Sequence, residues 1–249
     1  MNASTPVSPL VHRTRIKICG LTREQDVDAA VAAGADAVGF VLYRKSPRCV
    51  TPRRAAELAA RLPPFVCPVL LFVNEPLADV RDACEGVAAA TVQFHGDESP
   101  DYCLAATGNG ARPFLRAARI PLDGSTSFDL VRFAAEYPTA QALLLDAHVD
   151  GYGGGGKAFD WSRLPPSVNC HLVLSGGLTP ANVTDGIVQV RPRCKTLAVD
   201  VSSGVEMSAS GGTTLKGIKD PDKINRFVAA VRAADALLAG STHALLSTT

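Results

Sequence analysis

The chain has 249 residues, of which 47% are hydrophobic and 20% are charged, and its formal net charge is +1. These values are ordinary for a soluble globular protein that is large enough to bury one sizeable core. The small charge leaves no electrostatic footprint for nucleic acid or an anionic membrane, and no apolar run approaches the roughly 20 residues that span a bilayer. We therefore expect neither a nucleic-acid nor a membrane partner.

The seven cysteines are odd in number, irregularly spaced and without any Cys-x-x-Cys pair. This usage argues against a disulfide framework or a zinc knuckle, and it favours a reduced, cytoplasmic protein. The histidines show no metal-ligand spacing, so we predict no metal. Residues 1–14 are polar and lack the apolar core of a secretory signal, so we expect a disordered N-terminal extension.

Along the chain, short runs rich in Val, Leu, Ile and Phe recur, and each is followed by an Ala- and Leu-rich amphipathic stretch. Such apolar runs are typical of parallel strands buried on both faces, and the stretches between them are typical of crossover helices. The predicted strands cover residues 15–20, 37–42, 67–73, 91–96, 112–117, 142–147, 171–176 and 196–202. The predicted helices cover residues 23–33, 52–62, 76–85, 99–106, 126–136, 161–164, 180–188 and 220–238.

Eight strand–helix units predict an α/β fold, a single (β/α)8 (TIM) barrel over residues 15–238, with a loose tail at 239–249. The small-residue loops after its last two strands favour the phosphate-binding type. An open doubly wound sheet is the alternative, which is weakened because no Gly-x-Gly-x-x-Gly follows the first strand. In a (β/α)8 barrel the carboxyl ends of the strands gather at one mouth, where the active site lies. The polar strand ends predicted to line it are Cys19, Asn74, His95, Arg116, Asp146, Ser175 to Gly177 and Asp200 to Ser203.

Cys19 and Asp146 each end a predicted inward-facing strand, where a side chain is both held and open to solvent. Cys19 is either one more buried thiol or a base, and a thiolate is a competent base where cations or a helix N-terminus stabilise it. We expect Lys17 to point away from Cys19. Asp146 follows three leucines, where a carboxylate is costly to bury unless it is paired or protonated. Asp146 either forms hydrogen bonds with the loop that follows or acts as a general acid.

Two small-residue segments end the seventh and eighth strands, at Ser175-Gly176-Gly177 and Val201-Ser202-Ser203-Gly204. Loops after these strands are the usual phosphate site of this barrel, because backbone amides and helix N-termini bind the dianion. The glycine-rich run 151–157 is either flexible surface or a cover that excludes water from the site.

Arg48 and His95 follow the second and fourth predicted strands. Most loop arginines are solvated, but one that faces the mouth could clamp a carboxylate with its forked donors. His95 is either a satisfied core histidine or part of the site.

Together these motifs resemble the phosphoribosylanthranilate isomerase family of tryptophan biosynthesis. The likeness runs, with gaps, from about residue 15 to 232 through Lys17–Thr22, Gly34–Phe40, Ser46–Arg48, Val92–Glu98, Leu144–Asp146, Gly153–Trp161, Leu174–Asn182 and Val199–Glu206. The resemblance implies an aldose–ketose isomerase without cofactors. It would convert N-(5'-phosphoribosyl)anthranilate to 1-(2-carboxyphenylamino)-1-deoxyribulose 5-phosphate, an Amadori rearrangement of a small phosphosugar.

Carried over by motif, the resemblance makes Cys19 the general base and Asp146 the general acid. Arg48 would bind the anthranilate carboxylate, and His95 and Asp200 would lie near the ribose. The phosphate would rest on amides around Gly154, Gly155, Gly156, Gly176, Gly177, Ser202 and Ser203.

One departure from the family is the segment 207–216, which is longer than usual and lies near the predicted phosphate loop. A monomer and a homodimer both remain open. The alternatives to the isomerase are another phosphosugar isomerase or epimerase, a barrel that binds a phosphate ligand without turnover, and a hydrolase that pairs Cys19 with His95.

Overall fold

The computed structural model describes residues 13–122, 128–148, 158–209 and 212–246. Eight parallel strands close into a barrel in which each strand pairs with the next and β8 returns to β1. The strands are β1 Arg15–Cys19, β2 Ala37–Val41, β3 Cys67–Phe72, β4 Thr91–Phe94, β5 Phe114–Pro121, β6 Ala142–His148, β7 Val168–Leu174 and β8 Cys194–Val201. The predicted α/β fold, a single (β/α)8 barrel, is confirmed.

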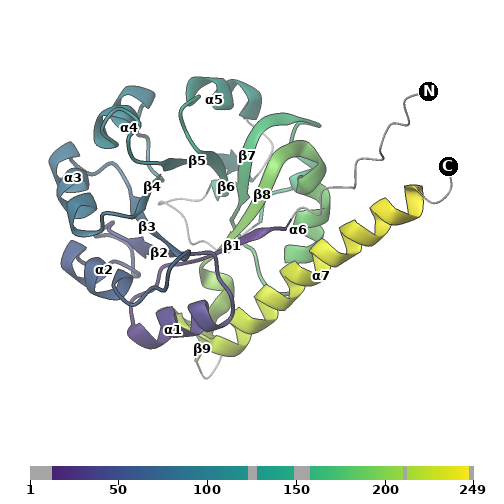
Figure 1. Ribbon diagram of the computed structural model, residues 1–249, viewed down its shortest axis with the longest axis horizontal. Helices are drawn as coiled ribbons and strands as arrows, with labels where there is room; N and C mark the ends of the chain where they lie inside the picture. Colours follow the sequence, from purple (N-terminus) through teal and green to yellow (C-terminus); the bar gives the residue numbers. More distant parts are fainter. Residues whose placement is uncertain (1–12, 123–127, 149–157, 210–211, 247–249) are drawn as a thin grey trace, which may run out of the picture.

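Helices connect the strands on the outside of the barrel (Figure 1). They are α1 Glu24–Ala32, α2 Pro52–Ala59, α3 Leu77–Gly86, α4 Pro100–Ala106, α5 Leu130–Glu136, α6 Val183–Val190 and α7 Pro221–Leu246, with 3-10 turns η1 Trp161–Arg163, η2 Arg191–Arg193 and η3 Ser203–Val205. Strand residues that face these helices, such as Ile16, Ile18 and Phe40, are almost fully buried and form the main core. The helices therefore leave the inner faces and the strand ends as the place for polar groups.

The fifth strand and the last helix extend well beyond their predicted ends. The fifth strand runs to Pro121, beyond the predicted end at 117, and pairs with β6 over its whole later half. The last helix, which lies beside α6 and α1 (Figure 1), continues to Leu246 instead of ending at 238. The reason is composition: the stretch after 233 is rich in Ala and Leu, both good helix formers, and contains no proline.

The long segment after the eighth strand forms a two-stranded antiparallel sheet, β9 Glu206–Ser208 with β10 Thr214–Lys219. Thr214 pairs with Ser208 and Lys219 with Glu206, and the register shifts between these two pairs. This hairpin brings Lys219 back to the end of β8, beside Ser202. The described residues of the insertion near 207–216 therefore belong to a hairpin at the barrel's mouth. Residues 210–211 lie outside the described residues.

Candidate active site

Lys17 and Cys19 both face the interior of the barrel, so the expectation that Lys17 points away is wrong. Residues two apart on a strand share a face, and only their immediate neighbours alternate. A Cβ built on Gly39 of the adjacent strand would lie 2.7 Å from Cys19 Sγ and 3.1 Å from Lys17 Cε. Gly39 thus leaves the room that both side chains occupy, and each of them is 4% exposed.

Lys17 connects the thiol to a buried polar network at the ends of β7 and β8. Its Nζ lies 2.8 Å from Asp200 Oδ1, and the Ser175 hydroxyl donates to Asp200 Oδ2 at 3.2 Å. Burial alone would lower the pKa of Lys17, but the carboxylate of Asp200 and the thiol of Cys19 outweigh burial and raise it. Burial raises the pKa of Cys19, and the Lys17 ammonium opposes that rise. Lys17 is thus the main group that favours the Cys19 thiolate, and the more distant Lys219 ammonium acts in the same direction.

Asp146 lies at the carboxyl end of β6 and is 5% exposed. Its Oδ2 is 2.9 Å from His95 Nε2, its Oδ1 accepts a hydrogen bond from the Ala147 amide at 2.9 Å, and His95 Nδ1 is 2.9 Å from Gln93 Nε2. A glutamine amide can donate or accept, so Gln93 can support either tautomer of His95. His95 in turn can donate to an Asp146 carboxylate or accept from an Asp146 carboxylic acid. The chain Gln93–His95–Asp146 accordingly suits a group that changes its protonation state.

Arg48 is buried at the mouth, where its guanidinium forms a two-point ion pair with Glu206. The Nε–Oε1 distance is 2.6 Å and the Nη2–Oε2 distance is 2.8 Å. Burial alone would raise the pKa of Glu206, but its bond to Arg48 and the charge of Lys219 outweigh burial and lower it. Burial lowers the pKa of Lys219, and the Glu206 carboxylate offsets only part of that fall.

The predicted phosphate loops meet beside Asp146 and Arg48. Gly176 has φ of +76°, a left-handed conformation, and a Cβ there would lie 2.6 Å from the Ala147 amide nitrogen and 2.7 Å from Asp146 Oδ1. Only glycine fits such a position. Gly177 follows it, and Ser202 and Ser203 end the eighth unit. Gly154, Gly155 and Gly156, with the rest of the run 151–157, lie outside the described residues.

Two residues predicted to line the mouth, Arg116 and Asn74, have their side chains or contacts elsewhere in the structure. Arg116 points outward from β5, with its guanidinium 5.5 Å from the Phe133 ring centre and 5.0 Å from that of Tyr137, because the strand's phase puts the neighbouring Leu115 and Ala117 inside. Asn74 connects the loops after β3 and β4: its backbone amide donates to Glu98 Oε1 at 2.8 Å. Neither is placed with Cys19 or Asp146.

Four buried polar residues of the site had not been predicted from the sequence as site residues: Lys17, Gln93, Glu206 and Lys219. Correct strand alternation identifies the first two, because Lys17 shares a face with Cys19 and Gln93 with His95. Glu206 and Lys219 lie outside the eight strands, and only the pairing of the hairpin brings them to Arg48.

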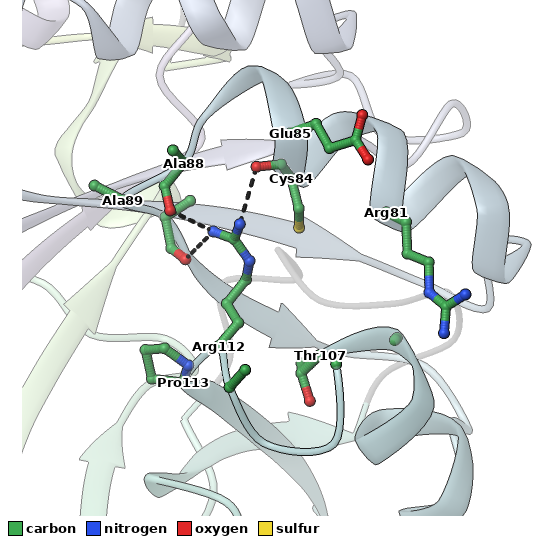
Figure 2. A pocket seen from close by; sticks show the side chains of 12 residues that line it. Arg81, Cys84, Glu85, Ala88, Ala89, Thr107, Arg112 and Pro113 are labelled. Carbon is green, nitrogen blue, oxygen red and sulfur yellow. Dashed lines mark hydrogen bonds between the residues drawn. The ribbon is translucent and has the colours of Figure 1, made fainter.

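A hollow among the described residues lies at the opposite end of the barrel. It has a volume of about 500 Å³ and is lined by the end of α3, the end of α4 and the loops that lead into β4 and β5. Figure 2 shows the Arg112 guanidinium directed at carbonyl groups at the end of α3 and just after it, those of Cys84 and Ala88 among them. None of the predicted site residues lines this hollow.

Membrane and metal features are absent from the described parts of the chain. No helix there is long and apolar enough to cross a bilayer. No group of three or more His, Cys, Asp or Glu side chains among the described residues could hold a metal ion. The absence of a metal and of a cofactor from the reaction stays a prediction.

A thiol and a carboxyl group that both face the interior near the carboxyl ends of two strands place this chain among the (β/α)8-barrel enzymes. A family model described as "N-(5'phosphoribosyl)anthranilate (PRA) isomerase" matches residues 16–230. N-(5'-phosphoribosyl)anthranilate isomerases from Methylibium petroleiphilum and Dechloromonas aromatica are 58% and 59% identical, over 92% and 90% of this chain and 99% and 98% of theirs.

The crystal structure of the phosphoribosyl anthranilate isomerase from Thermus thermophilus is similar at a TM-score of 0.73 and 32% identity, over 88% of this chain and 99% of that one. A second crystal structure of a phosphoribosyl anthranilate isomerase is described as a complex with reduced 1-(o-carboxyphenylamino)-1-deoxyribulose 5-phosphate. It is similar at a TM-score of 0.69 and 35% identity, over 88% of this chain and 99% of that one. The chain belongs to the N-(5'-phosphoribosyl)anthranilate isomerase family. The prediction of an isomerase of tryptophan biosynthesis is thereby confirmed.

Proposed function

We propose that this enzyme isomerises N-(5'-phosphoribosyl)anthranilate with Asp146 as general acid and Cys19 as general base. The observation that carries these roles is the placement of both groups on the inner face of one barrel, each at a strand's carboxyl end and each beside a buried polar partner. Each such acid or base typically accelerates a reaction by about 10²- to 10⁴-fold.

In the first step Asp146 gives its proton to the ring oxygen of the aminated ribose. The C1–O bond breaks towards that oxygen, and the nitrogen lone pair forms a C1=N iminium. The iminium acidifies C2, and Cys19 as thiolate then takes the C2 proton. The electrons of that C–H bond become a C1=C2 double bond, and the iminium electrons return to nitrogen. The enolamine relaxes to the ketone when its hydroxyl loses a proton and C1 gains one.

Each of the two polar networks supports one of the two proton transfers of this reaction. Lys17 favours the thiolate that accepts a proton, and His95 holds the carboxyl group that delivers one. Asp200 holds Lys17 and, with His95, would face the ribose.

The substrate's two anionic groups need separate sites. Arg48 would bind the anthranilate carboxylate, since a guanidinium matches a carboxylate with two parallel donors. Gly176, Gly177, Ser202 and Ser203 would offer amides to the phosphate, and Gly154 to Gly156 would complete that site. The expected ligand is a small phosphosugar.

The test supplies phosphoribosylanthranilate and follows the loss of its fluorescence, with and without a chelator. Cys19→Ser and Asp146→Asn should each lower kcat by at least about 10²-fold while leaving the affinity for a phosphate-bearing product analogue near normal. Cys84→Ser is the matched control, because Cys84 is buried in α3 beside the hollow at the far end. Full activity in either site variant would refute its assigned role, and a non-catalytic barrel would show no turnover in the parent enzyme.

The assembly and compartment are part of the proposal as well. One similar structure is described as monomers generated from a dimeric phosphoribosylanthranilate isomerase of Thermotoga maritima, at 34% identity and a TM-score of 0.68. For this chain a monomer and a homodimer are distinguished by sedimentation velocity, which compares the mass in solution with the 26.0 kDa of one chain. The expected compartment is the cytoplasm, which cell fractionation tests.

A further inference from the structure

The β9–β10 hairpin contributes two charged side chains that are sealed from solvent at the mouth of the barrel. Glu206 begins β9 and Lys219 ends β10, and both side chains are 0% exposed. Their charged atoms lie 3.3 Å apart, and the Arg48 guanidinium is against the same carboxylate. Two cations thus share one carboxylate, which leaves one positive charge in a buried cluster.

Glu206 fixes the orientation of Arg48. Its two oxygens occupy the edge of the guanidinium formed by Nε and Nη2. Glu206 is itself held: Oε1 also accepts from the Gly217 amide at 2.8 Å and from Lys219 Nζ. A guanidinium is a rigid planar fork, so fixing one edge fixes the other. The other edge, formed by Nη1 and the second hydrogen of Nη2, is not used by Glu206.

The Arg48 stem packs directly on the backbone that follows Cys19. Gly20 has φ of +75°, and a Cβ there would lie 2.5 Å from Arg48 Cδ and 3.1 Å from Ser202 Oγ. Lys219 is on the other side of this contact, since its Nζ donates to the Ser202 carbonyl at 2.9 Å. The cluster therefore lies between the base and the loop predicted to hold the phosphate.

We propose that Glu206 is a positioning residue that holds Arg48 with its unused edge towards the substrate's carboxylate, while Lys219 keeps the cluster cationic. This inference rests on the role of Arg48 proposed above. The buried positive charge gives it a second support, because an uncompensated buried charge is costly and an anionic substrate group offsets that cost. The hairpin is then part of the substrate site, and its strands set the arginine's direction.

The test measures binding of two reduced product analogues by calorimetry, one with the ring carboxylate and one with a plain phenyl ring. Glu206→Gln should weaken binding of the carboxylated analogue by about 10- to 100-fold and leave the phenyl analogue unchanged. KM should rise accordingly, with a smaller change in kcat. Charge alone predicts the opposite, because Glu206→Gln raises the cluster's charge and should tighten carboxylate binding.

Two further variants separate positioning from charge. Glu206→Gln combined with Lys219→Met restores the cluster's net charge of one, as in the parent, but not the two-point ion pair that orients Arg48. The double variant should therefore still lose the preference for the carboxylated analogue. A regained preference would show that Glu206 only neutralises Lys219 and would overturn the inference. Glu206→Asp, which keeps the charge on a shorter stem, should lose the preference too, and it serves where thermal unfolding shows that the glutamine variant is not folded.

Arg48→Met separates this inference from the proposed function. If Arg48→Met abolishes the preference for the carboxylate and the Glu206 variants retain it, the positioning role is wrong and the role of Arg48 stands. If Arg48→Met keeps the preference, the carboxylate is bound elsewhere and the role proposed for Arg48 is wrong as well.

Discussion

Replacing Gly39 by alanine should disable the enzyme by moving its base. Gly39 is opposite Cys19 in the register of β1 and β2, and the new methyl group would be 2.7 Å from the sulfur, whereas ordinary contacts begin near 3.4 Å. The sulfur must therefore shift by about 0.7 Å, and misplacement of a catalytic group by about 1 Å can cost 10²-fold in rate. We expect kcat to fall by about 10- to 100-fold.

The free energy of unfolding should change much less than the rate. Overpacking costs about 1–3 kcal/mol, but replacing a strand glycine by alanine returns about 0.5–1 kcal/mol. Chemical denaturation measures this change, and the fluorescence assay measures kcat. Gly86→Ala is the matched control, because its nearest contact would be Ala56 Cβ at 4.0 Å. In a Cys19→Ser background, Gly39→Ala should have little further effect on rate. A Gly39→Ala enzyme with the parent's kcat would refute the reasoning.

Three further outcomes are expected. Lys17→Met removes the cation that favours the thiolate, so the pKa of Cys19 rises and the ascending limb of kcat/KM should move to higher pH; an unmoved limb would exclude Lys17 from this role. His95→Asn should lower kcat by about 10-fold or more with little change in KM, and a change confined to KM would make His95 a binding residue only. Arg112→Met removes donors to the carbonyls of Cys84 and Ala88 (Figure 2) and to those of Val87 and Ala90. It should lower the free energy of unfolding by about 2 kcal/mol while kcat stays at the parent's value, and lost activity in the folded variant would contradict this.

The sequence predicts the barrel well because each strand is a continuous apolar run and each run is followed by a helix signal. It also predicts that Cys19 ends its strand and that Asp146 lies near the end of its own, which continues to His148, since a polar residue after such a run marks the point where the chain leaves the core. Strand alternation already gives Lys17 the same face as Cys19, but the sequence predicts the side-chain direction of Arg116 less well. Runs that are apolar on both faces carry no period, so the phase must come from strand pairing.

The partners of buried charges were the least predictable feature. Glu206 and Arg48 are 158 residues apart, and no spacing rule links two such positions. Their contact depends on the return of β10 to the end of β8, within a segment that resembled an insertion of unknown use. Local patterns identify elements, whereas the choice of ion-pair partner is made by the closed barrel and its hairpin.

The polar groups inside the barrel belong to two separate networks, one joining Lys17, Asp200 and Ser175 and the other joining Gln93, His95 and Asp146. No hydrogen bond among the described residues joins the two. Substitutions in one network should therefore adjust one titration limb of the reaction without displacing the other. A laboratory selection for activity at a new pH could then retune proton removal and proton delivery one at a time.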